Sequence, residues 1–175
     1  MNATQAVIEA PAAHSVRQLT AADAEAFRDI HLEALKAYPA AFAADWDEER
    51  GLPLADFAAR LEQLSVLGGF AGAELAGIAT IQKQPLKKRR HMAMLWGMYV
   101  KDAYRGSGLA AAIMQAAIAR AEQEVDQLEL YVAVGNDRAS RFYKSFGFEP
   151  YGVMPRSLRV DGVDHDAEMM VRIFR

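Results

Sequence analysis

The chain has 175 residues, of which 52% are hydrophobic and 25% are charged, with no cysteine and a formal net charge of −3. This length and composition are typical of one globular domain with a sizeable core, and the lack of cysteine excludes disulfides, thiolate catalysis and zinc–cysteine sites. The small negative charge gives no overall attraction to nucleic acid or anionic lipid, and no run of about 20 apolar residues is present that could cross a membrane. We therefore expect no nucleic-acid partner, no membrane partner and no metal.

The first residues of the chain do not resemble a secretory signal. Residues 1–13 lack both the basic start and the continuous apolar run of a secretory signal. We expect these residues to form a flexible tail, followed by a single domain over residues 14–175. The absence of cysteine fits a reducing compartment, so we expect a cytoplasmic location.

The first half of the chain predicts a strand, two helices and a hairpin. A short strand is expected at 17–19, and Thr20 with Asp23 then has the pattern of a capping box that begins a helix. Pro39 ends that helix. The further elements expected here are a loop at 40–46, a second helix beginning at Pro53, and two strands within 66–82 that turn near 72–74.

The second half of the chain alternates strands with single helices. The expected elements are a basic turn at 87–91, a strand at 92–100, a helix at about 108–124, a half-buried strand at 128–134, a helix from Asn136 to Gly147, and a hairpin over 151–175 that turns at Asp161-Gly162. The basic turn is either a solvated turn that protects a sheet edge or a rim that attracts an acidic substrate or a cofactor phosphate. Together these elements predict an α/β protein with a mixed sheet and helices on its faces.

The informative segment is 98–110, where a strand leads through a glycine-bearing turn into a helix. Glycines allow unusual backbone dihedral angles and let an anion approach without a Cβ in the way. The first amides of a helix have no partner within it, so such a terminus is a ready phosphate site. A purely structural turn is the alternative at this stage.

Two nucleotide-binding motifs fit this segment poorly. A Walker A loop requires Gly-Lys-Ser/Thr, whereas Gly108 is followed by Leu109 and Ala110. Residues 106–111 do match Gly-x-Gly-x-x-Ala, but five residues separate Val100 from the first glycine. The acid that should end the next strand and bind ribose is also absent there.

Two motifs resemble those of the GNAT acetyltransferase superfamily. Residues 105–110 read Arg-Gly-Ser-Gly-Leu-Ala, which resembles the signature Arg/Gln-x-x-Gly-x-Gly/Ala of that superfamily. Residues 136–148 resemble its segment Asn-x-x-Ala-x-x-x-Tyr-x-x-x-Gly-Phe without a gap. The resemblance extends from the first strand to the terminal hairpin. It implies a GNAT-like fold, with a central, mostly antiparallel sheet, a splayed pair of parallel strands at 92–100 and 128–134, and about four helices.

The resemblance also implies that acetyl-CoA is the cosubstrate and lies in the gap between the splayed strands. The positions that it assigns to cofactor binding are Met98, Tyr99, Val100, Arg105, Gly106, Ser107, Gly108, Leu109, Ala110, Asn136, Ala139 and Tyr143. By this resemblance the backbone of Met98 and Val100 pairs with the pantetheine arm, and the amides from Arg105 or Gly106 through Ala110 hold the pyrophosphate. Asn136 is assigned to the pantetheine side and Tyr143 to the thioester sulfur.

The spacing of the second motif supports this assignment. Asn136, Ala139 and Tyr143 fall at i, i+3 and i+7, so they share one helix face, and the small alanine leaves room for a ligand. Each position also has a structural interpretation, Asn136 as an N-cap and Tyr143 as a core residue. The implied catalytic residue is Tyr143, which would act as general acid for the departing CoA thiolate. A main-chain amide near Val100 would stabilise the oxyanion.

The sequence does not single out a general base. Several relatives place a glutamate in the strand before the pyrophosphate loop, but residues 92–100 contain no carboxylate. The candidates elsewhere are Glu129, Tyr131 and His91, each of which also has a structural interpretation, and a water relay is equally consistent with the sequence. The missing carboxylate leaves open a non-catalytic acyl-CoA-binding sensor or assembly module.

The expected acceptor is an amine-bearing small molecule or peptide. In the superfamily its site is formed by the first two helices and the terminal hairpin. The residues here that could form an aromatic and acidic rim for a cationic amine are Phe42, Asp45, Trp46, Glu48 and Arg156. The sequence leaves the oligomeric state open, although a homodimer is one possibility, because domains of this superfamily often pair through sheet edges or hairpins.

Overall fold

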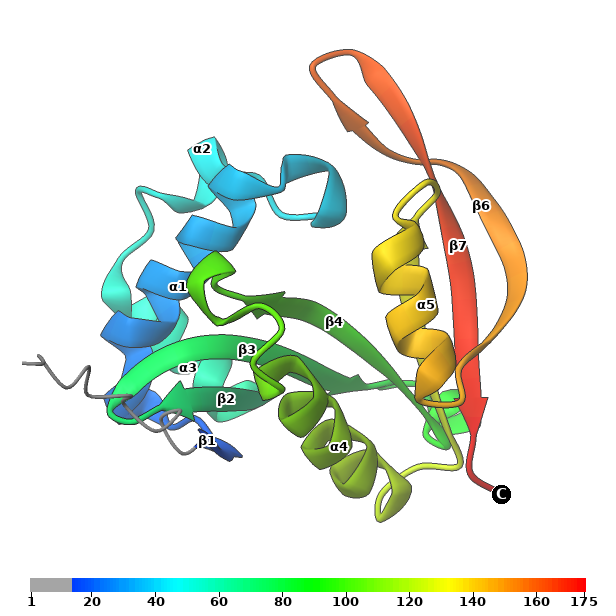
Figure 1. The fold of residues 1–175 in the computed structure, drawn as a ribbon, viewed down its shortest axis with the longest axis horizontal. Helices are drawn as coiled ribbons and strands as arrows, with labels where there is room; N and C mark the ends of the chain where they lie inside the picture. Colours follow the sequence, from blue (N-terminus) through cyan, green and yellow to red (C-terminus); the bar gives the residue numbers. More distant parts are fainter. Residues whose placement is uncertain (1–13) are drawn as a thin grey trace, which may run out of the picture.

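A computed structural model of the protein describes residues 14–175, so the expected tail at 1–13 lies outside the described residues. A seven-stranded sheet with the order β1-β2-β3-β4-β5-β7-β6 forms its centre (Figure 1). The strands are β1 (His14–Gln18), β2 (Ser65–Ala71), β3 (Glu74–Lys83), β4 (Met92–Val100), β5 (Gln127–Ala133), β6 (Glu149–Val160) and β7 (Val163–Ile173). The α-helices are α1 (Ala24–Ala37), α2 (Trp46–Glu49), α3 (Leu54–Gln63), α4 (Leu109–Glu122) and α5 (Asp137–Ser145). Four 3₁₀ turns are η1 (Ala21–Asp23), η2 (Pro39–Ala41), η3 (Lys87–Arg89) and η4 (Asp102–Tyr104).

The sheet is mixed, as predicted. β4 and β5 are parallel, and every other neighbouring pair is antiparallel. The pairing of β4 with β5 lasts only from Met92 to Met94, after which the two strands separate. The predicted splayed parallel pair is therefore present.

The helices differ from the prediction at one place. The sequence predicted about four helices and a loop at 40–46, whereas the structure has a fifth, one-turn helix α2 that begins at Trp46. The carboxylate of Asp45 accepts hydrogen bonds from the amides of Asp47 (2.8 Å) and Glu48 (3.2 Å), which caps this turn. A single turn is too short to show helical periodicity, so the pattern gave no sign of it.

Two apolar clusters cover opposite faces of the sheet. α1 and α3 pack over Val66 and Ile78, and α4 packs over their sequence neighbours Leu67 and Ala79. Adjacent residues of a strand point to opposite faces, so the two clusters are the two layers of one core. Within residues 14–175, no helix is both long and apolar enough to cross a membrane.

Glycines in the sheet allow α4 to lie directly on the backbone of β2 and β3. A Cβ added at Gly69 would lie 2.5 Å from Cδ1 of Ile113 in α4, and one added at Gly77 would lie 2.6 Å from the same atom. Both distances are far below a normal van der Waals contact. The small residues therefore fix the height of α4 above the sheet, and with it the position of the glycine-bearing turn at its N-terminus.

We expect Gly77→Ala to lower the free energy of unfolding by about 1–3 kcal/mol, because the added methyl group meets Ile113 and the main chain of Tyr99. Gly51→Ala is the matched control, since a Cβ there has no atom within 4 Å, and it should change stability by less than about 0.5 kcal/mol. Urea unfolding of the two variants beside the parent protein measures both values. Equal midpoints for Gly77→Ala and the parent would contradict the close packing.

Candidate active site

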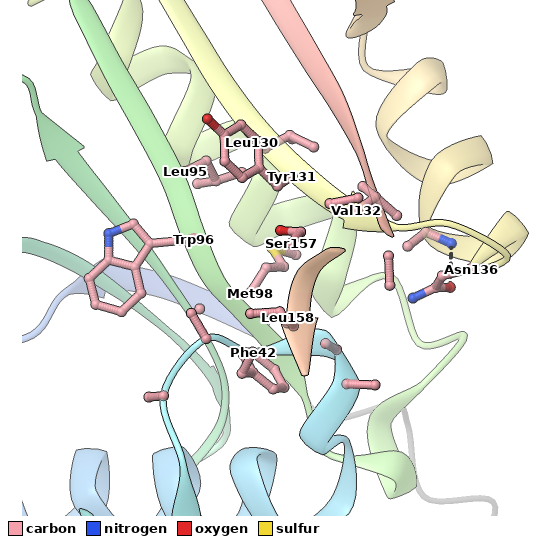
Figure 2. Close-up of a pocket in the computed structure, with 18 of the residues that line it drawn as sticks. Phe42, Leu95, Trp96, Met98, Leu130, Tyr131, Val132, Asn136, Ser157 and Leu158 are labelled. Carbon is pink, nitrogen blue, oxygen red and sulfur yellow. Dashed lines mark hydrogen bonds between the residues drawn. The ribbon is translucent and has the colours of Figure 1, made fainter. Parts of the chain in front are cut away.

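A cavity of about 600 Å³ opens where β4 and β5 separate. Its walls come from residues 94–98 of β4, residues 130–133 of β5, residues 40–44, helices α1 and α5, the β6–β7 hairpin, and single residues of α2, α3 and β3. Figure 2 shows Met98 of β4, Val132 of β5 and Leu158 of β6 around this space. The wall is mostly apolar, with a few polar groups, which is the usual character of a small-molecule site.

A bulge in β4 accounts for the separation of the two strands. Ile78 pairs with Tyr99 and Thr80 with Trp96, so β4 carries one residue more than β3 over this stretch. Gly97 lies in the bulge with φ of +64°, a conformation that other residues rarely adopt. A bulge bends its strand and increases the local twist, which here turns β4 away from β5. A glycine inside an apolar strand is the sequence signal that could have revealed it.

A second irregularity brings the hairpin over the cavity. The register of β6 on β7 shifts between Met154 and Leu158, and Arg156 within that stretch has φ of +52°. Ser157 and Leu158 consequently line the cavity opposite β5 (Figure 2). The tip of the hairpin turns at Asp161-Gly162, as the sequence predicted.

The glycine-bearing turn before α4 presents main-chain amides that have no partner. Gly106 and Gly108 have φ of +79° and +91°, and a Cβ added at either would meet no atom within 4 Å. Among residues 14–175, no hydrogen bond is donated by the amides of Gly106, Gly108, Ala110 and Ala111. Four free donors at the positive end of a 14-residue helix have the arrangement that can bind an anion.

Other amides of the same segment are already used within the protein. The amide of Arg105 donates to the carbonyl of Asp102 (3.2 Å), and that of Ser107 donates to the carbonyl of Tyr104 (3.3 Å). The amide of Leu109 makes only a long contact of 3.4 Å with Oγ of Ser107. The free donors are therefore a subset of the 105–110 segment, extended by Ala111.

The side chain of Arg105 connects this turn to the end of α1. Its guanidinium lies 2.8 Å from a carboxylate oxygen of Asp102 and 4.8 Å from the ring centre of Tyr38, whose hydroxyl also donates to Asp102 (2.8 Å). Tyr99, by contrast, is buried under α1 and donates its hydroxyl to Glu33 (2.8 Å). Burial and that hydrogen bond raise the pKa of Tyr99 far above its usual value. Only the backbone of Tyr99 is thus available to a ligand.

The expected face of α5 lines the cavity with Asn136, Ala139 and Tyr143. The side-chain oxygen of Asn136 accepts a hydrogen bond from the amide of Ala139 (3.2 Å), so this residue is an N-cap whose NH₂ group stays available (Figure 2). The half-buried Tyr143 ring packs against Phe148, and its hydroxyl makes no hydrogen bond to the described part of the chain. Burial raises the pKa of Tyr143 to about 12, so the hydroxyl keeps its proton at neutral pH.

Two of the three suggested bases lie away from the cavity. Glu129 is buried beside Gln127 and His91 is exposed at the start of β4, and neither lines the cavity, although Tyr131 does. The alternation of β5 predicted a polar face for Glu129. That prediction was wrong for Glu129, which is buried, although Tyr131 on the same face of the strand is 41% exposed.

The suggested acceptor rim is also largely elsewhere. Phe42 lines the cavity, whereas Asp45 caps α2 and Trp46 is flanked by Lys36 and Arg50 at 5.1 and 5.0 Å from its ring centre. Glu48 and Arg156 are exposed and do not line the cavity either. Of the five suggested rim residues, only Phe42 therefore lines the cavity.

Three residues that the sequence did not single out meet at the cavity wall. His31 of α1, Glu49 of α2 and Arg60 of α3 all line it, and Glu49 accepts from His31 Nε2 (2.7 Å) and from Arg60 (2.8 Å). No local pattern could have found them, since 18 residues separate His31 from Glu49. In the part of the chain that the structure describes, no group of three or more His, Cys, Asp or Glu side chains is placed to bind a metal.

Comparison with known proteins identifies the family. Residues 25–148 match the acetyltransferase (GNAT) family, which is more than half of the chain. The chain belongs to the GNAT family. Its predicted membership is thereby confirmed, and the two motifs at 105–110 and 136–148 both lie within the matched segment.

Similar proteins agree with the GNAT assignment. L-amino acid N-acetyltransferase AaaT of Escherichia coli (strain K12) is 32% identical over 102 residues, which cover 57% of this chain and 62% of that relative. The match thus spans less than two thirds of the relative's length. A GNAT-family acetyltransferase from Streptococcus pneumoniae superposes with a TM-score of 0.82 at 22% identity, covering 92% of this chain and 99% of that one. The putative acetyltransferase yncA from Salmonella typhimurium, whose structure includes its cofactor acetyl-CoA, superposes with a TM-score of 0.78 at 22% identity. The superposition covers 93% of this chain and 95% of that one. These likenesses confirm the predicted fold.

Proposed function

We propose that the protein transfers the acetyl group of acetyl-CoA to the amine of a small molecule or peptide by direct attack. Two observations carry this proposal: the cavity between β4 and β5, and the turn with free amides at Gly106, Gly108, Ala110 and Ala111, which follows β4 along the chain. The family supports the reaction type, and the L-amino acid N-acetyltransferase relative supports an amine acceptor.

The cofactor fits the residues that are present. The open space at Gly106 and Gly108 suits a pyrophosphate held by main-chain amides. In the gap left by the bulge, the backbone of Met98 and Val100 is expected to pair with the pantetheine arm, and the free NH₂ group of Asn136 is expected to donate to it from α5. The thioester of acetyl-CoA supplies the activated acetyl group.

The residues of the chain then have three tasks. The cavity holds amine and thioester side by side, and such positioning can contribute several kcal/mol. A main-chain amide near Val100 is proposed to stabilise the oxyanion. Tyr143 is proposed to give its proton to the departing thiolate, for which it must be protonated, as its raised pKa ensures.

Ligand binding and turnover test the proposal separately. Acetyl-CoA, but not NAD, should raise the melting temperature, because a ligand that binds only the folded state stabilises it. Release of CoA can be followed directly with a thiol reagent, since the protein has no cysteine to react. We expect release with at least one amine of a panel that contains L-amino acids, their amides, aliphatic and aromatic amines and short peptides.

A non-catalytic acyl-CoA sensor is the second candidate, and the absence of a carboxylate from β4 favours it. Stabilisation by acetyl-CoA without CoA release on any amine of the panel would support the sensor and reject the transferase. No stabilisation by acetyl-CoA would reject both.

A further inference from the structure

His31, Glu49 and Arg60 form a cluster in the cavity wall, contributed by α1, α2 and α3. These helices lie on one side of the molecule and α5 lies on the other (Figure 1). His31 is only 5% exposed, yet it contributes to the cavity wall. Arg60 holds both carboxylate oxygens of Glu49, at 2.8 and 3.1 Å, and one of these oxygens lies 2.7 Å from Nε2 of His31. Three helices thus hold one imidazole in a defined orientation at the edge of the cavity.

The hydrogen bonds of the cluster determine which ring nitrogen of His31 carries the proton. Burial by itself would raise the pKa of Glu49, but the hydrogen bonds from Arg60 and His31 lower it overall, so Glu49 is a carboxylate that only accepts. Nε2 must therefore donate. Nδ1 is left with a lone pair, and it makes no hydrogen bond to any residue that the structure describes. A base oriented by a carboxylate is the arrangement that enzymes use for proton abstraction.

We propose that Nδ1 of His31 takes the proton from the ammonium group of the acceptor and so generates the attacking amine. This inference rests on the proposed acetyl transfer. One N–H bond of the ammonium breaks, its electron pair stays on the amine nitrogen, and one Nδ1–H bond forms. The resulting imidazolium keeps its hydrogen bond to the Glu49 carboxylate, and it returns its proton to solvent before the next cycle.

The electrostatic setting suits this role. Burial lowers the pKa of His31 below its usual value and the Arg60 charge lowers it further, while Glu49 partly opposes both, so the imidazole is neutral at pH 7 and ready to accept a proton. Phe27 and Phe57 pack against the ring, with ring centres 5.6 and 6.2 Å away, and supply the apolar surroundings. A neutral base with a nearby carboxylate can accept a proton at physiological pH.

The other ionisable groups of the cavity wall are less suited to the task. Apart from the cluster they are Tyr131, Tyr143, His165 and Asp166. Asp166 is exposed and already accepts a hydrogen bond from the amide of Arg156 (2.8 Å). His165 forms no ion pair within residues 14–175 that would orient its ring. His31 therefore combines burial, orientation and a free nitrogen.

The test is the pH dependence of kcat in His31→Gln. Glutamine can still donate to Glu49 but cannot accept a proton. In the parent, kcat should decrease as the pH is lowered through a pKa below 6.5, where His31 becomes protonated. In His31→Gln the decrease should instead occur around the higher pKa of the bound amine. For an α-amine with a pKa of about 8, the variant should be about tenfold slower at pH 7 and equal to the parent above pH 9. A purely structural role would give the same deficit at every pH.

Two further variants sharpen the test. Glu49→Gln keeps an acceptor for Nε2 of His31 but removes the charge that stabilises the imidazolium, which lowers the pKa of His31 further. The decrease of kcat at acidic pH should therefore occur at lower pH than in the parent. His91→Gln is the control, since His91 is exposed and does not line the cavity, and its profile should overlay that of the parent. A His31→Gln profile that also overlays the parent overturns the inference while leaving acetyl transfer intact. A parent protein that releases no CoA overturns the proposed function instead.

A measurement on the unmodified protein covers the case in which His31→Gln does not fold. The chain has four histidines, so imidazole ¹⁵N signals of the histidine-labelled protein can be assigned by substituting the other three. We expect the shifts of His31 at pH 7 to show a protonated Nε2 and an unprotonated Nδ1. The opposite tautomer, or an imidazolium, would reject the proposed base.

Discussion

Replacing Tyr143 with phenylalanine is expected to lower kcat by about a hundredfold while leaving the affinity for acetyl-CoA nearly unchanged. The substitution removes one hydroxyl and keeps the ring that packs against Phe142 and Phe148. Since that hydroxyl bonds to no residue between 14 and 175, its loss leaves no buried partner unsatisfied, and the fold should tolerate the change. Steady-state CoA release gives kcat, and calorimetry with acetyl-CoA gives Kd.

A tyrosine outside the cavity provides the matched control for that experiment. Tyr151 on β6 is 49% exposed and does not line the cavity, so Tyr151→Phe should match the parent in both kcat and Kd. Because the pKa of Tyr143 is about 12, no loss of activity from its ionisation is expected between pH 7 and 10. Full activity of Tyr143→Phe would remove the residue from the role of proton donor. A large rise in Kd would instead assign it to cofactor binding.

Replacing Gly108 with valine is expected to weaken acetyl-CoA binding by about a hundredfold, equivalent to about 2.7 kcal/mol. Gly108 has φ of +91°, where a β-branched residue is strained, and its Cβ would enter the open space into which the free amides point. The strain should also lower stability by about 1–3 kcal/mol. Calorimetric titration with acetyl-CoA measures the first effect and thermal unfolding measures the second.

Gly162→Val separates backbone strain from the loss of the anion site. Gly162 has φ of +79° and no atom within 4 Å of an added Cβ, but it lies at the tip of the β6–β7 hairpin. This variant should lose stability to a similar degree and keep the parent affinity for acetyl-CoA. If Gly108→Val binds acetyl-CoA as tightly as Gly162→Val does, the turn before α4 does not hold the pyrophosphate.

Local patterns were sufficient for most of the elements, for the glycine-bearing turn before α4 and for the face of α5 that lines the cavity. Each of these signals spans only a few residues of the chain. They are the glycines at 106 and 108, the spacing of Asn136 with Tyr143, and the Asp161-Gly162 turn. Backbone preferences of this kind depend on a residue and its near neighbours, so they can be read before the chain is folded. A glycine inside an apolar strand was a weak sequence signal for the bulge at Gly97. Only the register of β4 against β3 establishes that the bulge is there.

The cavity wall near residues 42–49 and the burial of Glu129 could not be predicted in this way. Trp46 has the composition of an acceptor wall, but its ring lies between Lys36 and Arg50, whereas Phe42, four residues earlier, lines the cavity. Glu129 belongs to a strand with a half-buried pattern, yet its side chain is only 7% exposed, whereas Tyr131 on the same face is 41% exposed. Which side of a residue faces a cavity depends on what the rest of the chain places against it.

The sequence by itself therefore determined the family, the mixed sheet, the glycine-bearing turn and the helix face that carries Tyr143, because each is encoded in short-range backbone preferences and side-chain periodicity. Only the tertiary structure decided that His31, Glu49 and Arg60 meet at one wall of the cavity. Their contact depends on the packing of three helices, and no spacing along the chain encodes the distance between side chains that such packing brings together.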